Sequence, residues 1–451
     1  MAATTAFGIG MFLMPLLWIL IDLAAFSRAR PGEPVTSIAA GTGVHDFALL
    51  VPIYGSMRYL ENFDFLKDYG RRVILCTTSA ESDEFMRDLR RVAADGGFRI
   101  ILADEPTRPE PPGGAGSASS KKSTSSSKRD TVIRAALEMV DSEYVVCIDA
   151  DTSTSESIDA LVAAFAARDL DFASIHLVVS NRTESMVTRL QGHEYELSMK
   201  LRRVCPWLVS GACHVARTEV HREVMRRHTL FFQANDVEAG LLAEQLGYRV
   251  GHIRFLVPTA VPVSARALLR QRYAWVGGEF RLFAVNVKFA RRHPLFFAYG
   301  LVFVIMMFPL RWIAVIEDPW TTLLILFAVY VVVITGLCWK ERDVALLLMP
   351  FYTLVFTTLV VPLGAVSYAQ MARASRNKGV IRLDEPTTSV WSGALFDAEM
   401  DEIFRKPRPA PRRVAISAVC TDDQFRTPTR RQIVISATCT DVRARYQTVA
   451  V

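Results

Sequence analysis

Residues 144–151, Tyr-Val-Val-Cys-Ile-Asp-Ala-Asp, place a short apolar run directly before two acidic residues. A short apolar run rich in β-branched residues and bounded by polar ones is typical of a buried strand. In an open α/β sheet, ligands bind just beyond the carboxyl ends of the strands, which is where Asp149 and Asp151 would stand. Two carboxylates there can bind a hard divalent cation, and the cation can in turn bind the oxygens of a nucleoside diphosphate. The simpler interpretation is an acidic turn, because Asp is common in turns.

Short apolar runs alternate with amphipathic segments on both sides of this stretch. We expect strands at 47–54, 72–77, 98–103 and 144–149, and helices at 81–94 and 130–140. This alternation predicts an α/β domain over residues 45–260, built on a doubly wound, mixed and mostly parallel sheet. A Pro/Gly- and Ser-rich stretch at 106–127 interrupts the pattern and is expected to be a flexible surface insertion.

Long apolar segments predict a second, membrane-embedded part. Apolar residues make up 51% of the chain, which is high for a soluble protein. Residues 1–30 contain a candidate transmembrane anchor, and 295–370 contain further candidate transmembrane helices at 295–316, 320–339 and 345–369. Residues 264–292 mix basic and aromatic residues, as a helix on a membrane surface does, and Gly277-Gly278 is expected to bend or break that helix.

The flanking charges predict the orientation of this membrane part. Arg28 and Arg30 follow the first apolar segment, so the positive-inside rule places the N-terminus outside and residues 45–260 in the cytosol. We therefore expect a multi-pass protein of the cell (plasma) membrane. Four full crossings would return the C-terminus outside, against the basic residues after position 369, so the number of crossings stays open.

Charge and cysteine content exclude other classes of protein. The net charge of +6 is modest, and the basic residues cluster beside apolar segments, which indicates membrane lipids rather than nucleic acid. The seven cysteines form no CxxC pair and so no disulfide or zinc framework. The polar tail at 383–451 repeats Ile-Ser-Ala-x-Cys-Thr-Asp at 416–422 and 435–441, which could pair as a hairpin.

Three further signals could serve a ligand site. Ser210-Gly211 breaks an apolar run, which suggests close backbone approach to a ligand. Asp236 opens a helix that runs to about residue 246, either as a helix cap or as a base that takes a proton from a hydroxyl group. Lys128-Arg129 precedes a helix and either counters a diphosphate charge or keeps the insertion soluble.

The order of these motifs resembles a processive family-2 glycosyltransferase of the hyaluronan, chitin and cellulose synthase type, over roughly residues 45–370. The resemblance implies a GT-A fold in which Asp149 and Asp151 bind the metal and diphosphate and Asp236 is the catalytic base. It also implies acceptor binding by Ser210, Gly211 and Trp275. The implied nucleotide-binding residues are Val51, Pro52, Tyr54, Asp104, Lys128, Arg129, Asp149, Gln271 and Arg272.

Three positions depart from the family pattern. An expected Asp-Asp-Gly after the second strand reads Cys76-Thr-Thr-Ser-Ala80, so Asp104 is the substitute candidate for nucleoside recognition. The arginine of the Gln-x-x-Arg-Trp motif is Ala274, and the glutamate before the proposed base is Asn235.

The function implied is inverting transfer from a UDP-sugar, with Mg²⁺ or Mn²⁺, to a growing polysaccharide that the transmembrane helices could export. One alternative is transfer of a single sugar to a polyprenyl phosphate or another lipid acceptor. Another is a non-catalytic membrane scaffold or transporter on the same fold. Fold alone does not decide between them.

Overall fold

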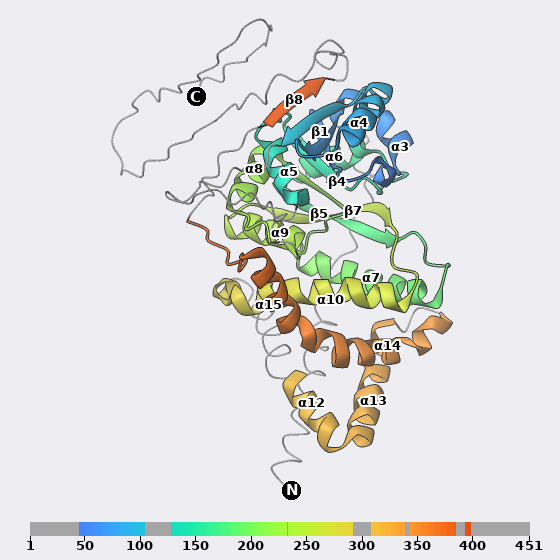
Figure 1. Cartoon of the computed structure of the whole chain (residues 1–451). Coiled ribbons are helices and arrows are strands. Elements are labelled where there is room, and N and C mark those ends of the chain that lie inside the picture. Colours follow the sequence, from blue (N-terminus) through green and yellow to red (C-terminus); the bar gives the residue numbers. More distant parts are fainter. Residues whose placement is uncertain are drawn as a thin grey trace, which may run out of the picture.

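The computed structural model describes residues 45–103, 128–231, 233–291, 308–338, 343–384 and 393–397. The predicted anchor over 1–30, Asp104, the insertion at 106–127, most of the span predicted at 295–316 and both repeats of the tail lie outside these ranges. Among the described residues, a sheet domain lies at one end of the molecule and apolar helices lie at the other (Figure 1).

The sheet contains eight strands: β1 (Phe47–Pro52), β2 (Val73–Thr78), β3 (Arg99–Ala103), β4 (Tyr144–Ile148), β5 (Phe172–Val179), β6 (Cys213–Arg217), β7 (Val250–Thr259) and β8 (Gly393–Asp397). Their order is β7-β5-β6-β4-β1-β2-β3-β8. The pairs β4–β1, β1–β2, β2–β3 and β5–β7 are parallel. β6 is antiparallel to β4 and β5, and β8 is antiparallel to β3. The sheet is therefore mixed, and a segment of the predicted polar tail forms one edge.

Helices cover both faces of the sheet. They are α3 (Phe63–Lys67), α4 (Asp83–Gly96), α5 (Lys128–Leu137), α6 (Ile158–Ala167), α7 (Met186–Val204), α8 (Thr218–Arg227) and α9 (Asn235–Gln245), with short 3₁₀ turns η1 (Met57–Tyr59) and η2 (Gly70–Arg72).

The central strands are buried on both faces, as their continuous apolar sequences predict. All six residues of β1 are buried, and alternate ones enter different clusters. Leu49 and Val51 pack with residues of α4, α6 and α7, whereas Ala48 and Leu50 pack with residues of α5, α8 and α9. This double covering fixes the register of β1 and β4, so the carboxyl ends of both strands emerge at the same edge of the sheet.

The strands predicted at 47–54, 72–77, 98–103 and 144–149 correspond to β1–β4, and the predicted helices correspond to α4 and α5. The expectation that Gly277-Gly278 bends or breaks the interface helix is wrong, because α10 (Ala265–Phe280) runs through both glycines. A Cβ on Gly277 would lie 2.6 Å from Ser367 Oγ, and one on Gly278 would lie 2.8 Å from the Cβ of Ala234. The two glycines therefore allow close packing on both sides of a continuous helix.

The remaining helices follow α10 in the chain, and the labelled ones lie below α10 or against it (Figure 1). They are η3 (Arg281–Val285, a π-helix), η4 (Val287–Arg291), α12 (Phe308–Glu317), α13 (Pro319–Cys338), η6 (Val344–Leu347), α14 (Met349–Val355), η7 (Phe356–Val360, a π-helix), η8 (Val361–Leu363) and α15 (Gly364–Ser375).

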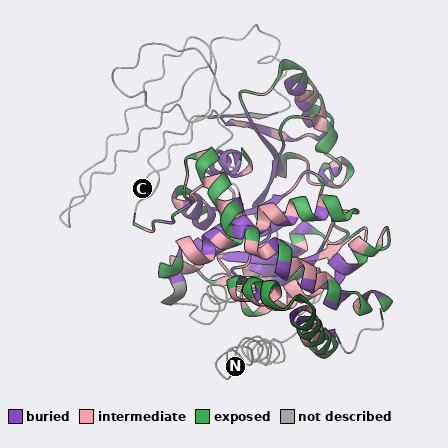
Figure 2. Cartoon of the chain, turned by 60° about the horizontal axis from the view of Figure 1, so that its bottom comes forward, coloured by how far each residue is buried: buried purple, intermediate pink, exposed green. Residues whose placement is uncertain are grey.

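Two helical stretches in the described part are long and apolar enough to cross a membrane, Pro319–Cys338 and Met349–Ser375. Only 28% of the most apolar window of the first stretch is buried. Figure 2 shows exposed residues along this helix at the lower edge of the view. Trp320, Leu324 and Val332 are among its exposed apolar residues. Length and composition thus permit two crossings in the described residues.

Candidate functional site

The two acidic residues after β4 lie at the carboxyl edge of the sheet. The Asn62 side-chain amide donates to the carbonyl oxygens of Asp149 (3.1 Å) and Thr152 (2.5 Å), which fixes the backbone of the turn. The Thr152 hydroxyl donates to Asp151 Oδ1 at 3.2 Å. Asp151 is exposed and the Asp149 side chain is 34% exposed, so both carboxylates are accessible. Nothing in the sequence singles out Asn62, because its role depends on a contact across 87 residues.

Arg129, at the start of α5, joins this edge to the loop before β6. Its Nε donates to Asp149 Oδ1 at 2.9 Å, and its Nη2 donates to the carbonyl oxygen of Gly211. Burial would lower the pKa of Arg129, but the charges of Asp149 and Asp130 outweigh burial and raise it. Arg129 is therefore a permanent cation between the two segments.

Gly211 connects this arginine to Asp236. The Gly211 N–H donates to Asp236 Oδ2 at 2.7 Å, while the Val237 N–H donates to Oδ1 at 3.0 Å. A Cβ on Gly211 would lie 3.5 Å from Asp236 Oδ2 and 3.9 Å from Arg129 Cζ. The structure thus brings Asp149, Arg129, Gly211 and Asp236 into one continuous chain of contacts.

The carboxylates that meet at this site repel one another. Burial raises the pKa of Asp149; the Arg129 guanidinium opposes the rise, and the charges of Asp151 and Asp236 add to it. Three carboxylates thus act on one another, and Arg129 pairs with only one of them among the described residues. A partly exposed group of oxygen donors with excess negative charge has the chemistry of a site for a hard divalent cation.

The end of β1 forms the wall beside Lys128 and Arg129. Val51 and Pro52 are buried in the strand, and the exposed Tyr54 ring lies 5.9 Å from Lys128 Nζ. Glu81 accepts from the Gly55 N–H at 3.1 Å and lies 4.0 Å from Lys128 Nζ. All the predicted nucleotide-binding residues of this segment therefore lie at the same sheet edge as Asp149.

The backbone before Asp236 is held in an unusual conformation. Ala234 has φ 54°, in the left-handed region that non-glycine residues rarely adopt. Gly278 packs directly against it, and Arg281 Nη2 donates to its carbonyl oxygen at 3.1 Å. The next residue, Asn235, donates from Nδ2 to Asp130 Oδ2 at 2.6 Å. A glutamate in place of Asn235 would meet the Asp130 carboxylate, so the departure from the family pattern has a local electrostatic reason.

A fully buried ion pair lies behind Asp236, and the sequence analysis did not identify it. Arg281 Nη1 donates to Glu238 Oε2, and both side chains have no exposed area. The N–H and hydroxyl of Thr229 donate to the same carboxylate at 2.6 and 2.8 Å. This pair ties the first turn of α9 to the end of α10. The Asp-x-Glu spacing was visible, but its partner 43 residues away was not.

The predicted residues of α10 lie in a separate group of contacts. Arg272 Nη2 donates to Glu194 Oε2 at 2.8 Å, and its guanidinium lies 4.2 Å from the centre of the Trp275 ring. The Tyr352 hydroxyl donates to the same Glu194 oxygen at 2.7 Å. The structure therefore does not bring Arg272 to Asp149, and one face of Trp275 is covered by the guanidinium. Gln271 Oε1 is buried without a partner among the described side chains.

Tyr195 on α7 relates this group to Asp236. Burial raises the pKa of Tyr195, and the charges of Arg272, Glu194, Arg202 and Asp236 all act on it. Tyr195 is therefore linked by charge to Asp236 and to the Arg272 group, and no pattern in the sequence singles it out.

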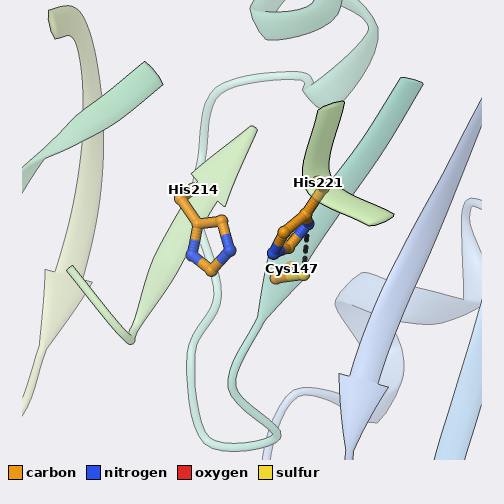
Figure 3. Close-up of side chains that lie close together, drawn as sticks. All are labelled: Cys147, His214 and His221. Atoms are coloured by element: carbon orange, nitrogen blue, oxygen red, sulfur yellow. Dashed lines mark hydrogen bonds between the residues drawn. The ribbon is translucent and has the colours of Figure 1, made fainter. Parts of the chain in front are cut away.

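Three potential metal ligands converge in the core beneath the sheet edge. Cys147, His214 and His221 come from β4, β6 and α8 (Figure 3), and Cys147 Sγ lies 3.9 Å from His221 Nδ1. Their ligand atoms all lie within 4.8 Å of one another. Burial lowers the pKa of His214 to about 3 and raises that of Cys147 to about 12, so both are neutral. His214 also stacks on Phe172 at 5.4 Å, and the cluster fits neutral core packing.

One family model matches the middle part of the chain. The family model described as "Glycosyl transferase family group 2" matches residues 144–339, from β4 to the end of α13. This part of the chain is therefore similar to glycosyltransferases of that family, and the match includes β4 to β7 of the mixed α/β sheet. No curated protein matches the chain.

Similar solved structures include the mannosyltransferase PcManGT from Pyrobaculum calidifontis in complex with GDP-Man and Mn²⁺. It is 16% identical, the match covers 84% of this chain and 98% of that one, and the TM-score is 0.45. TarS 1–349 from S. aureus with UDP-GlcNAc is 12% identical over 73% of this chain and 91% of that one, with a TM-score of 0.35. Glucosyl-3-phosphoglycerate synthase from Mycobacterium tuberculosis is 14% identical over 56% and 84%, with a TM-score of 0.31.

Proposed function

We propose that this protein is a membrane-embedded, inverting glycosyltransferase that uses a UDP-sugar to elongate a polysaccharide. The observation that carries the proposal is the chain of contacts from Asp149 through Arg129 and Gly211 to Asp236. It joins carboxylates suited to a cation with a separate carboxylate suited to accept a proton. Sugar transfer from a nucleotide needs the cation and the proton acceptor close together, about the width of one sugar ring apart.

The proposed cofactor is Mg²⁺ or Mn²⁺, held by Asp149 and Asp151. The fit rests on the donor set, because both groups offer accessible oxygens. Burial raises the pKa of Asp149, and the charges of Asp151 and Asp236 add to that rise. A bound cation would neutralise the leaving diphosphate. Arg129 and Lys128 add positive charge on the same side, where the diphosphate would lie.

The proposed base is Asp236. In the reaction, the acceptor hydroxyl oxygen bonds to the anomeric carbon on the face opposite the diphosphate. The bond from that carbon to the diphosphate oxygen breaks with its electron pair, and the hydroxyl proton moves to Asp236. The hydrogen bonds from Gly211 and Val237 orient the carboxylate for this transfer. Ser210, Gly211 and Trp275 are the proposed acceptor-binding residues.

The membrane part of the proposal rests on the apolar helices. Exposed apolar side chains on α12 and α13, including Ile316 and Trp320, would be unfavourable in water and favourable in lipid. We propose that α10 lies at the membrane surface, with the sheet domain in the cytosol and the product passing outward. A polar chain cannot cross hydrocarbon unaided, so export would require polar groups between these helices.

The test uses purified full-length protein and a panel of UDP-glucose, UDP-N-acetylglucosamine and UDP-glucuronate, read by UDP release and product length. We expect transfer with at least one donor, loss of transfer in EDTA, and a rate about 10²–10⁴-fold lower in Asp236→Asn. Asp159→Asn is the matched control, because Asp159 is exposed on α6 and pairs with Arg72. Normal transfer in Asp236→Asn, or no release of UDP from any donor, would refute the proposal.

A further inference from the structure

Basic side chains from β5, β7 and the end of α7 interact with one another through their charges. These side chains, here called the β5 basic cluster, are His176, Arg202, Arg203, His252 and Arg254. The rings of His176 and His252 have centroids 5.9 Å apart across β5 and β7. Arg202 Nη1 and the backbone N–H of Leu177, the residue after His176, contact the same sulfur atom, Met199 Sδ, at 3.9 and 3.2 Å.

The charges of Glu196 and Asp236 act on His176 and Arg202, but no carboxylate in the described part of the chain forms an ion pair with the arginines of this cluster. Arg202, Arg203 and Arg254 form none of the ion pairs found among the described residues. Arg202 Nε, His176 Nδ1 and His252 Nε2 are each buried without a hydrogen-bond partner there. Buried polar nitrogens are nearly always satisfied in proteins, and buried charges are nearly always paired. The missing partner is therefore expected from a ligand that offers several negatively charged oxygens.

The electrostatics agree with this geometry. Burial, together with the charges of Arg203, Arg254 and Arg202, lowers the pKa of His176 to about 4. Burial, together with His176 and the charges of Arg202, Arg203 and Arg168, lowers the pKa of His252 to about 3. Both imidazoles are therefore neutral at pH 7, and each can donate one N–H to an anion beside the arginines.

The cluster lies on the Asp236 side of the site. The last β5–β6 pair is Ser174 with His214, so β5 continues past β6 in the direction of the segment that contains Gly211. Gly211 in turn donates to Asp236. The carboxylate whose charge acts on Arg202 is Asp236, not Asp149 or Asp151. Of the three site carboxylates, Asp236 is therefore the one that the cluster is related to by charge.

We propose that the β5 basic cluster binds a phosphate or carboxylate group of the acceptor, so that the substrate elongated by this enzyme is an anion. This inference rests on the proposed function, because it assigns the acceptor to the side of Asp236. In the proposed function the diphosphate of the donor lies beside Lys128 and Arg129, which do not belong to this cluster. Three arginines and two neutral imidazole donors exceed what a neutral sugar hydroxyl would require.

The first experiment tests anion binding without catalysis. Full-length protein in detergent is titrated with sodium phosphate and, at matched ionic strength, with sodium chloride, while the thermal midpoint is followed. Phosphate is expected to raise the midpoint more than chloride, and Arg254→Gln is expected to abolish the difference. Arg254 is exposed, so this variant folds without repacking. Arg87→Gln, an exposed arginine on α4, is the control and should respond as wild type. Equal effects of the two salts would overturn the inference.

The second experiment identifies the source of the anion. UDP release is measured with neutral oligosaccharides, with oligosaccharides that contain uronic acids, and with a polyprenyl phosphate in micelles. We expect stimulation only by an anionic acceptor, and a KM for that acceptor about ten- to a hundredfold higher in Arg202→Gln and Arg254→Gln. The KM for the UDP-sugar should not change. Equal use of neutral acceptors, or a raised donor KM in place of a raised acceptor KM, would overturn the assignment.

The two failures are distinguishable. If wild type releases no UDP from any nucleotide sugar, the proposed function and the acceptor assignment fall together, and the phosphate titration still decides whether the cluster binds anions. If UDP is released into water but anionic acceptors give no stimulation, the function stands and only the acceptor assignment is refuted.

Discussion

Replacing Glu238 by glutamine removes one charge from the buried ion pair behind the proposed base and keeps the shape of the side chain. Glu238 accepts from Arg281 and from the N–H and hydroxyl of Thr229. In Glu238→Gln, Arg281 keeps its contacts to the Ala234 carbonyl (3.1 Å) and the Phe231 ring (4.8 Å) but loses its counter-ion.

The magnitude follows from the burial of both groups. Removing one partner of a fully buried pair leaves an uncompensated charge and typically costs about 3–5 kcal/mol of stability. With a conversion of about 2–4 °C per kcal/mol, the thermal midpoint should fall by roughly 10 °C. Burial alone would raise the pKa of Glu238, but His228, Arg281 and the Thr229 N–H outweigh it and lower the pKa. Its stabilisation is therefore present above the unfolded pKa near 4.3 and is lost as the pH falls through the lower folded value.

The assay is thermal unfolding of full-length protein in detergent at pH 7, followed by near-UV circular dichroism. Glu138→Gln provides the matched control, because Glu138 pairs with Arg226 at the surface and should cost less than about 1 kcal/mol. The double variant Glu238→Gln with Arg281→Met should recover part of the loss, since it removes the unpaired charge. A midpoint equal to wild type, or a double variant no more stable than Glu238→Gln, would contradict the reasoning.

Three more predictions concern the site. Protonation of Asp149 competes with cation binding, so the Mn²⁺ concentration needed for activity should rise as the pH falls toward the raised pKa of Asp149. Asp236→Asn removes a charge that raises this pKa and should move the effect to lower pH. Mn²⁺ titrations of nucleotide binding at several pH values check both expectations. Gly278→Ala places a Cβ 2.8 Å from the Cβ of Ala234 and should cost about 1–3 kcal/mol by thermal unfolding, whereas Gly336→Ala, which has no atom within 4 Å, should be neutral. Asn235→Asp replaces the 2.6 Å hydrogen bond between Asn235 and Asp130 with two facing carboxylates and should lower the thermal midpoint. Adding Asp130→Asn should restore the midpoint. An unchanged midpoint in Asn235→Asp would mean that this contact is absent in solution.

Some features of the fold and the site were predictable from local sequence patterns, and others were not. The strand before Asp149 and the helix after Lys128 were predictable, because continuous apolar runs and helical periodicity are local signals. Gly277 and Gly278 were misinterpreted, because a glycine pair permits either a bend or close packing and only the neighbours at Ser367 and Ala234 select the second. Arg272 lies at the expected position in sequence, yet its partner is Glu194, which no spacing rule could indicate.

The sequence by itself determined the alternation of strands and helices, the acidic residues at the end of β4 and the apolar segments, because each depends on side chains within one turn or strand. The tertiary structure alone decided that Asp149 and Asp236 share one chain of contacts through Arg129 and Gly211, residues that lie 82 positions apart. It also decided that Arg281 pairs with Glu238 and that the arginines of the β5 basic cluster form no ion pair among the described residues. Charges interact through space, so their pairing follows from the register of the sheet and the packing of helices on it rather than from their order in the chain.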